Sequence, residues 1–249
     1  MKKKTFYIAG YFTLTLAIGS CFNNNLEKIV VSSLDTTSTT TSTKATMASM
    51  FDGKTLSGWH GFNKTGEVKN WAIEDSTMVC LGAAKDAHGG DLVSDKSYEN
   101  FELSWQWKAT KGGNSGVMYH VIETPKYQAP YETGPEYQMI DDIGFPEKLE
   151  EWQKSGADYG MHLTNEKKKL LPVGEWNTSK IIFNNGNVEH WLNGEKIVEF
   201  KAWDDEWNKK KKEGKWKNYP DYGVAKKGKI ALQDHGNKMY FKNITITSL

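Results

Sequence analysis

The sequence predicts an all-β protein, folded as an antiparallel sandwich of two sheets of the jelly-roll type. Many short segments alternate apolar with polar residues and are separated by turn residues, which is typical of half-buried strands. In the clearest one, Phe101–Lys108, Leu103 and Trp105 fall on the apolar side and should face the core. Asn193-Gly194 lies between two such segments and predicts a tight two-residue hairpin. Antiparallel strands without sequence repeats and without a long amphipathic helix favour a two-sheet sandwich.

The expected strands follow one another along most of the chain. They are Trp71–Ile73, Thr77–Leu81, Asp91–Ser94, Phe101–Lys108, Gly116–Ile122, Tyr137–Asp141, Thr178–Asn184, Val188–Leu192, Lys196–Phe200, Lys229–Gln233 and Met239–Thr247. Asn185-Gly186 is expected to form a further turn. Only Glu147–Lys154 has the composition for one or two helical turns, and the lysine-rich run Lys209–Lys217 is interpreted as a solvated loop.

Residues 1–20 are interpreted as a lipoprotein signal peptide rather than as part of the fold. Lys2–Lys4 form a positive n-region, and Phe6–Ile18 form an apolar h-region that is short for a bilayer span. The segment ends at Ile18-Gly19-Ser20-Cys21, which resembles a bacterial lipobox, where the cysteine is acylated and becomes the new N-terminus. Cys21 is therefore the candidate lipidation site. An ordinary signal peptide followed by a coincidental cysteine is the alternative.

Residues 21–49 are expected to be a flexible tether, and residues 50–249 a single jelly-roll domain. The tether is rich in Asn, Ser and Thr, and it has no hydrophobic period with which to form a core. Cys80, the only other thiol, lies in an apolar strand pattern and should be buried and unreactive. If Cys21 carries the lipid, the two cysteines cannot form a disulfide.

Composition and charge narrow the classes of partner. The formal net charge is +1 at pH 7, and all the basic residues are lysine, so neither the charge nor the residue type favours nucleic acid. A membrane is expected as a partner only through the lipid anchor. Some of the ten tryptophans are candidates to line a sugar-binding cleft, although most should be buried or half-buried strand residues.

The segment Gly228–Ile246 places polar side chains at the end of a strand. Ile230 and Leu232 fall on one side, whereas Gln233 and His235 share the other. A glutamine and a histidine that point the same way at a strand end suit a binding or catalytic site. A polar strand end that faces water is the alternative.

The region around residue 114 offers two further candidates. Asn114 lies in Gly112–Gly116, where the glycines allow a sharp turn or the close approach of a ligand. In the strand that follows, His120 is expected to share a face with Met118. The six histidines have no HxH or HxxxH spacing typical of zinc ligands, and His190 is interpreted as a strand surface residue.

The strand that begins near residue 136 carries acidic and amide side chains. Glu136 and Gln138 occupy one side of this strand and Asp141 the other. We expect Glu136 and Gln138 to lie on one concave face with Gln233 and His235, where they would combine acid/base groups with hydrogen-bond partners for hydroxyls.

Six ordered blocks of sequence resemble the bacterial 3-keto-disaccharide hydrolase family. The blocks are FDGKTLSGW (Phe51–Trp59), GGDLVSDKSYENFELSWQWK (Gly89–Lys108), GGNSGVMYHV (Gly112–Val121), YETGPEYQMIDD (Tyr131–Asp142), GEWNTSKIIFNNGNVEHWLNG (Gly174–Gly194) and GKIALQDHG (Gly228–Gly236). The resemblance covers about residues 50–249. It implies a jelly roll like that of the concanavalin-like glycanases, and action on glycosides that a separate oxidoreductase has oxidised at C3 of the sugar. His120 stands where many members of the family carry arginine.

Such a substrate invites cleavage by elimination. A ketone at C3 acidifies the C2 hydrogen, so a base can remove it, the aglycone can leave from C1, and water can add back. His235, whose imidazole type titrates near neutrality, and Glu136 are the catalytic candidates. Gln138, Asn114, Gln233, Asp141 and His120 are the substrate-binding candidates. The same chemistry admits a divalent metal, although no ligand set is evident in the sequence.

Two other functions remain open at this point. One is a conventional glycoside hydrolase with two carboxylates, and the other is a non-catalytic carbohydrate-binding lipoprotein. In each case the expected location is the bacterial envelope, periplasmic or at the outer membrane, with attachment through lipid.

Overall fold

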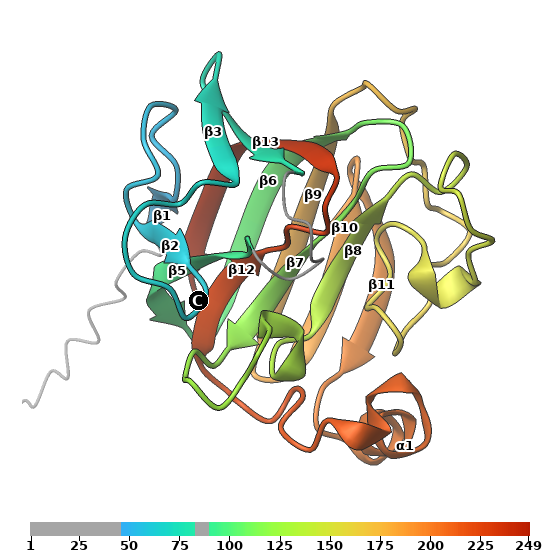
Figure 1. Cartoon of the computed structure of the whole chain (residues 1–249). Coiled ribbons are helices and arrows are strands. Elements are labelled where there is room, and N and C mark those ends of the chain that lie inside the picture. Colours follow the sequence, from blue (N-terminus) through green and yellow to red (C-terminus); the bar gives the residue numbers. More distant parts are fainter. Residues whose placement is uncertain (1–45, 83–89) are drawn as a thin grey trace, which may run out of the picture. The chain divides into compact units, whose positions relative to one another are not determined.

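The computed structural model describes residues 46–82 and 90–249. The predicted signal peptide, Cys21 and all but the last four residues of the predicted tether lie outside the described residues. The described chain confirms the predicted fold class, because its strands form two antiparallel sheets that pack face to face (Figure 1).

The larger sheet contains eight strands in the order β11-β10-β9-β6-β13-β4-β3, with β1 also paired to β13. Their bounds are β1 Met47–Ser49, β3 Trp71–Glu74, β4 Thr77–Leu81, β6 Phe101–Ala109, β9 Asn177–Asn184, β10 Asn187–Leu192, β11 Glu195–Lys201 and β13 Lys238–Ser248. Two-residue turns, Asn185-Gly186 and Asn193-Gly194, connect β9, β10 and β11 as predicted, and all four residues have positive φ.

The smaller sheet contains five strands in the order β2-β5-β12-β7-β8. Their bounds are β2 Trp59–Gly61, β5 Leu92–Tyr98, β7 Asn114–Val121, β8 Glu136–Ile140 and β12 Gly228–Leu232. Every residue of β7 and β8 is buried. One face of these strands packs against the larger sheet, and the other face therefore lies beneath the loops that cover it.

The core lies between the two sheets. Leu103 and Trp105 on β6 are each 1% exposed, which confirms the prediction that they face the core. Trp105 joins the layers, since its ring lies edge-on to Tyr137 on β8 at 5.0 Å and its Nε1 donates to Met139 Sδ at 3.2 Å. Cys80 is fully buried, as predicted, and burial is the main cause that raises the pKa of its thiol.

The paired part of the chain begins slightly earlier than predicted. β1, which falls within the last residues of the predicted tether, pairs with β13 from Met47↔Thr247 to Ser49↔Thr245. The strand is exposed and carries no alternating pattern, so the backbone ladder holds it rather than a buried face.

The interpretation of Lys209–Lys217 as a solvated loop is wrong. The run overlaps the second half of helix α1, Asp205–Glu213, and most of the 3₁₀ helix η3, Lys215–Asn218. Asp204 caps α1 by accepting a hydrogen bond from Trp207 N at 2.8 Å, and the buried Trp207 ring anchors the helix. The other short 3₁₀ helices are η1, Pro130–Glu132, and η2, Glu151–Gln153, which lies in the segment predicted to form helical turns.

The predicted face of His120 is also wrong, because β7 contains an irregularity. The register between β7 and β12 shifts between the pairs Lys229↔Val121 and Ala231↔Met118, and His120 has φ +54°. The extra residue on β7 interrupts the alternation. His120 is turned into the aromatic core, where its ring lies 4.3 Å from that of Phe183.

His190 is a core residue rather than the predicted surface residue. It is fully buried on β10, and its ring lies 4.8 Å from the ring of Tyr137 on the facing sheet.

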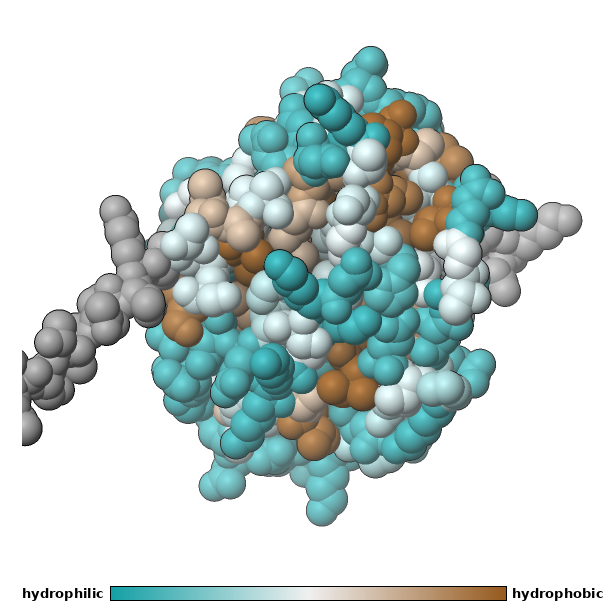
Figure 2. Space-filling view, turned by 90° about the vertical axis from the view of Figure 1, so that its left-hand side faces the viewer, coloured by the Kyte–Doolittle hydropathy of each residue, from teal (hydrophilic) through white to brown (hydrophobic). Residues whose placement is uncertain are grey.

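The surface seen in Figure 2 is largely hydrophilic, with hydrophobic residues in separate patches. Within the described chain, no helix is long and apolar enough to cross a membrane.

Candidate functional site

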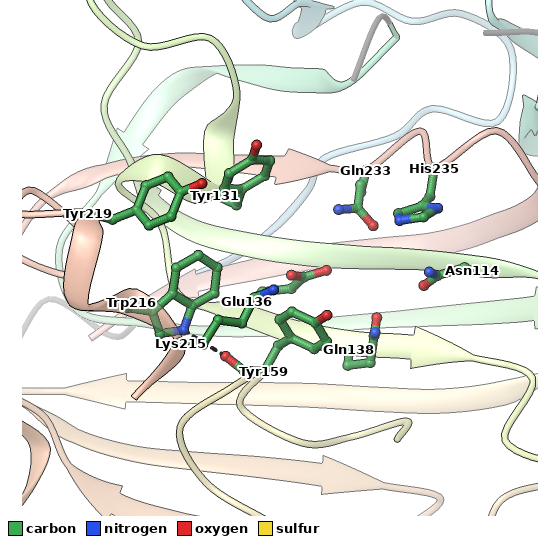
Figure 3. A pocket seen from close by; sticks show the side chains of 10 residues that line it. All are labelled: Asn114, Tyr131, Glu136, Gln138, Tyr159, Lys215, Trp216, Tyr219, Gln233 and His235. Carbon is green, nitrogen blue, oxygen red and sulfur yellow. Dashed lines mark hydrogen bonds between the residues drawn. The ribbon is translucent and has the colours of Figure 1, made fainter. Parts of the chain in front are cut away.

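A cavity of about 280 Å³ lies over the face of the smaller sheet that points away from the core (Figure 3). It has a polar end, formed by residues of β7, β8 and the end of β12, and an aromatic end, formed by loops and 3₁₀ helices. The residues that line it are Asn114, Tyr131, Glu136, Gln138, Tyr159, Lys215, Trp216, Tyr219, Gln233 and His235.

Glu136 and Gln138 reach the cavity because β8 alternates its side chains between the two faces of the sheet. Tyr137 and Met139 point to the core, so Glu136 and Gln138 point the other way. Opposite them on β7 lies Gly116, paired with Gln138. A β-carbon at Gly116 would stand 1.9 Å from Glu136 Oε1, so only glycine leaves room for the carboxyl group here.

The surroundings of Glu136 keep its carboxyl group protonated at neutral pH. Burial is the largest cause and raises its pKa to about 8. The charges of Asp91 and Asp158 also act to raise this pKa and that of Lys215 acts to lower it, so the value of about 8 is the net of burial and these three charges. In Figure 3 the Lys215 side chain extends toward Glu136 from the aromatic end of the cavity. A carboxyl group that titrates near pH 8 can act as a proton donor at pH 7.

Gln233 and His235 enter the cavity from the loop that follows β12. Gln233 N donates to Gly116 O at 2.9 Å, and Ser115 Oγ donates to Gln233 O at 2.7 Å. These bonds hold the residue after β12 against β7, so the Gln233 side chain lies over the same face as Glu136. His235 is half-buried and lies beside Gln233 at the polar end (Figure 3).

Asp234, between these two residues, anchors the loop from inside. Its Oδ1 accepts hydrogen bonds from Gly236 N at 3.0 Å and from the Cys80 thiol at 3.3 Å, while its Oδ2 accepts one from Asn70 Nδ2 at 2.9 Å. Asp234 N donates to Asp91 Oδ1 at 2.8 Å. The buried aspartate thus turns inward so that the side chains on either side of it turn toward the cavity.

The polar end also offers hydrogen-bond acceptors for a ligand. Asn114 Oδ1 and Gln233 Oε1 are buried and have no hydrogen-bond partner among the residues that the structure describes. Buried carbonyl oxygens need donors, and the hydroxyl groups of a sugar are suitable ones.

The aromatic end contains ring faces and one positive charge. Trp216 is 2% exposed, its ring stacks on Tyr222 at 4.1 Å, and its Nε1 donates to Tyr159 O at 2.9 Å. Lys215 Nζ lies 4.7 Å from the centre of the Tyr159 ring and 5.4 Å from that of Trp216. With Tyr131 and Tyr219, these residues form a surface on which a sugar ring or another flat group can stack.

The structure brings five of the predicted site residues to this cavity, namely Asn114, Glu136, Gln138, Gln233 and His235. The other two predicted binding residues do not line it. Asp141 accepts hydrogen bonds from the backbone N–H groups of Gly112, Ile143 and Gly144, which hold its pKa below the usual range against the effect of burial. His120 lies between the sheets, and burial lowers its pKa to about 4.

The aromatic end of the cavity is not predicted by the sequence. Lys215 and Trp216 fall in the run that was interpreted as a solvated loop, and Tyr131, Tyr159 and Tyr219 lie outside the expected strands. The one available signal was the pattern of Asp204 before α1 and Gly214 after it, which is typical of a capped helix.

No group of three or more His, Cys, Asp or Glu side chains in the described residues is arranged to hold a metal ion.

Comparison with known proteins places the chain in a family. The family model of the 3-keto-alpha-glucoside-1,2-lyase-like domain matches residues 46–247. A 3-keto-disaccharide hydrolase of Bacteroides thetaiotaomicron is 33% identical over 225 residues, which cover 80% of this chain and 77% of that protein.

Two solved structures from Parabacteroides distasonis, each described as a "putative glycosyl hydrolase", have a similar fold. One is 46% identical with a TM-score of 0.77, and the match covers 82% of this chain and 94% of that one. The other is 25% identical with a TM-score of 0.57, and the match covers 77% of this chain and 99% of that one. The chain therefore belongs to the family of 3-keto-alpha-glucoside-1,2-lyase-like domains, and it is a glycoside-cleaving enzyme.

Proposed function

We propose that the enzyme cleaves 3-keto-glycosides, and 3-keto-disaccharides in particular, by elimination of the aglycone followed by addition of water. One observation carries the proposal. Of the described residues that line the cavity, Glu136 alone has a carboxyl group, and His235 lines the same cavity. A conventional glycosidase needs two carboxyl groups at a set separation, whereas elimination from a ketone needs one base and one acid.

In the proposed first step His235 removes the proton from C2, and the electron pair moves onto the ketone oxygen at C3 to form an enolate. The enolate then collapses to a C1–C2 double bond and a restored ketone, and the bond between C1 and the glycosidic oxygen breaks. Glu136, protonated at neutral pH, donates its proton to the departing oxygen. The oxygen of water then adds at C1 and gives one proton back to the Glu136 carboxylate, while protonated His235 returns a proton to C2. This yields the free 3-keto sugar and restores both side chains.

The two ends of the cavity match the two parts of such a substrate. The amide N–H groups of Asn114, Gln138 and Gln233 can donate to the ketone oxygen as it gains negative charge, and their carbonyl oxygens can accept from sugar hydroxyls. The aromatic end, near Trp216 and Tyr219, then takes the departing part, for which a second sugar ring is suitable. The cleaved bond lies between the two ends, near Glu136.

The decisive experiment compares a glycoside with its 3-keto form. The purified enzyme should release the aglycone from the 3-keto-glycoside and leave the unoxidised glycoside intact, because only the ketone makes the C2 proton removable. In deuterated water the product should carry deuterium at C2, measured by NMR or mass spectrometry.

Comparable cleavage of the unoxidised glycoside without deuterium at C2 would contradict the proposal and favour a conventional glycosidase. Sugar binding without turnover of either compound would also contradict it and would favour a carbohydrate-binding protein.

We further propose a place for the enzyme in the cell and in a reaction sequence. Since a ketone at C3 is rare in ordinary glycosides, an oxidoreductase that oxidises the C3 hydroxyl must supply the substrate. The sequence of residues 1–21 supports export and attachment to the bacterial envelope through acyl chains on Cys21.

Replacing Cys21 by serine in the full chain should shift the protein from the membrane fraction to the soluble fraction while the specific activity stays the same. Acyl chains hold a lipoprotein to the membrane, and the substitution removes their attachment point without touching residues 46–249. Cell fractionation with immunoblotting measures the shift, and Ser20→Ala serves as a neighbouring control that should remain attached. If the serine variant stayed in the membrane fraction although its signal peptide had been removed, as checked by mass spectrometry of the N-terminus, the lipid anchor would be disproved.

A further inference from the structure

Lys215 brings a positive charge to the aromatic end of the cavity, and the cleavage steps above do not use it. Of the described residues that line the cavity, it is the only lysine. Its ammonium group has no ion pair and no hydrogen bond with any residue that the structure describes. The only carboxyl group of the described lining, Glu136, is mostly protonated at pH 7, because its pKa is about 8. The cavity therefore presents a cation without a counter-charge, which suits an anionic ligand.

Three aromatic rings hold the Lys215 ammonium in place. Nζ lies 4.7 Å from the centre of the Tyr159 ring, 5.4 Å from that of Trp216 and 5.7 Å from that of Trp152. Attraction to the ring faces restricts the side chain, but it leaves the positive charge available for an anion. Figure 3 shows the Lys215 side chain between Trp216 and Tyr159, extended into the cavity.

The loop that faces Lys215 leaves space for the lysine stem. A β-carbon at Gly160 would stand 3.0 Å from Lys215 Cδ, 3.2 Å from Lys215 Cβ and 3.0 Å from Trp216 Nε1. Gly160 also has φ +74°, a conformation that favours glycine. A glycine at this position therefore lets Lys215 and Trp216 pack closely against the loop that carries Tyr159.

The segment around Lys215 is positively charged as a whole. Residues 205–218, which form α1 and η3, contain six lysines and three acidic residues. Two other acidic side chains near the aromatic residues are already engaged. Asp221 pairs with Lys126, and Glu132 Oε1 accepts a hydrogen bond from Ala129 N at 3.0 Å. The local field should therefore attract anionic substrates to this end of the cavity.

We propose that Lys215 selects substrates whose departing sugar carries a negative charge, either the carboxylate of a uronic acid or a phosphate ester. The 3-keto ring then lies at the polar end of the cavity, and the departing ring lies beside Trp216 and Tyr219. Its anionic group pairs with Lys215 Nζ. The inference rests on the proposed function, because that function places the departing sugar at the aromatic end.

Lys215→Met is the test, since methionine keeps an apolar stem and removes the charge. The substrates are 3-keto-glucosides whose departing part is glucose, glucuronic acid or glucose 6-phosphate. For each protein, kcat/KM on an acidic substrate is divided by kcat/KM on the neutral one. In the variant this ratio should fall about fivefold or more for at least one acidic substrate, because a charge-assisted contact is lost. The substrate that shows the larger fall identifies the carboxylate or the phosphate as the group selected.

The ratio separates charge selection from a structural role of Lys215. Looser packing of the rings would lower kcat/KM on the acidic and the neutral substrates together and leave the ratio unchanged, which would overturn the proposal. Lys215→Arg keeps the positive charge and should keep a ratio within about twofold of the wild type. Lys217→Met is the matched control, because Lys217 is an exposed lysine of the same 3₁₀ helix that does not line the cavity. Its ratio should equal that of the wild type.

Binding of unoxidised disaccharides tests the same contact without the proposed reaction. Isothermal titration calorimetry compares glucosyl-glucuronic acid with glucosyl-glucose, and the ratio of their Kd values should shift about fivefold or more in Lys215→Met. If this shift occurred but no 3-keto-glycoside were cleaved, the charge selection would stand and the proposed reaction would be wrong. If 3-keto-glycosides were cleaved but neither ratio depended on Lys215, the proposed reaction would stand and the charge selection would be wrong.

Discussion

Replacing Glu136 by glutamine should lower kcat/KM on a 3-keto-glycoside by about 10²- to 10⁴-fold, the range expected for loss of a general acid. Glutamine has nearly the same shape and keeps the hydrogen-bonding capacity, but it cannot donate a proton to the departing oxygen. Steady-state kinetics at pH 7 measures the effect. A loss of less than about tenfold would mean that Glu136 is not the acid.

The same substitution should stabilise the fold, with a dependence on pH that identifies the cause. In the folded protein the pKa of Glu136 is about 8, against an ordinary value of 4.5. Below pH 4.5 the carboxyl group is protonated in both states and affects neither. Between pH 4.5 and pH 8 it ionises only in the unfolded state, so the free energy of unfolding of the wild type falls as pH rises.

Glutamine removes this penalty, so the variant should gain about 2 to 4 kcal/mol at pH 8 and almost nothing at pH 4, at about 1.4 kcal/mol per pKa unit. Urea unfolding at the two pH values measures the difference. Glu123→Gln is the control of opposite sign. Partial burial acts to raise the pKa of Glu123, but hydrogen bonds from Lys229 and His60 outweigh it and lower that pKa. The substitution should therefore destabilise the fold at pH 8, and less so at pH 4, where part of this stabilisation is already lost.

His235→Ala should lower kcat/KM by about 10²- to 10⁴-fold and should also abolish the exchange of the C2 proton with solvent. The second effect is specific to a base, because exchange at C2 requires removal of that proton whether or not the aglycone leaves. The midpoint of urea unfolding should change little, since His235 is half-buried in a loop beyond the end of β12.

His60→Ala is the matched control for this experiment. His60 is also half-buried and contacts carboxylates, Asp95 at 2.6 Å and Glu123 at 2.9 Å, but it lies on β2 and does not line the cavity. Its activity and its C2 exchange should equal those of the wild type. If the His235 variant still exchanged the C2 proton at the wild-type rate, a different group would be the base.

Much of the fold was predictable because its strands are locally encoded. Alternation of apolar and polar residues identifies the strand around Leu103 and Trp105, since a side chain's face depends only on its position along the strand. Asn193-Gly194 specifies its hairpin because both residues tolerate the positive φ that the turn needs. These signals do not require knowledge of any distant residue.

The polar end of the cavity was also predictable from the alternation of side chains along the strands. The faces of Glu136, Gln138 and Gln233 were readable from alternation, and the prediction that they share one cavity with His235 agrees with the lining observed in the structure. The face on which His120 lies was not predicted correctly, because an extra residue in β7 interrupts the alternation. Asp141 was predicted to bind substrate but does not line the cavity, because its carboxylate accepts hydrogen bonds from three backbone N–H groups of the adjoining turn and loop.

The aromatic end of the cavity and the chemistry of Glu136 depend on contacts between distant parts of the chain. Trp216 and Tyr159 lie 57 residues apart in sequence and meet only in the folded chain, where Trp216 Nε1 donates a hydrogen bond to the carbonyl oxygen of Tyr159. The alternation of residues along β8 shows to which face the Glu136 side chain points, but it does not show that the carboxyl group is protonated at pH 7. Its pKa is set by burial and by Asp91, Asp158 and Lys215, which reach it from three separate segments. Burial and Coulomb energies depend on distances in space, and a linear pattern of residues does not contain those distances.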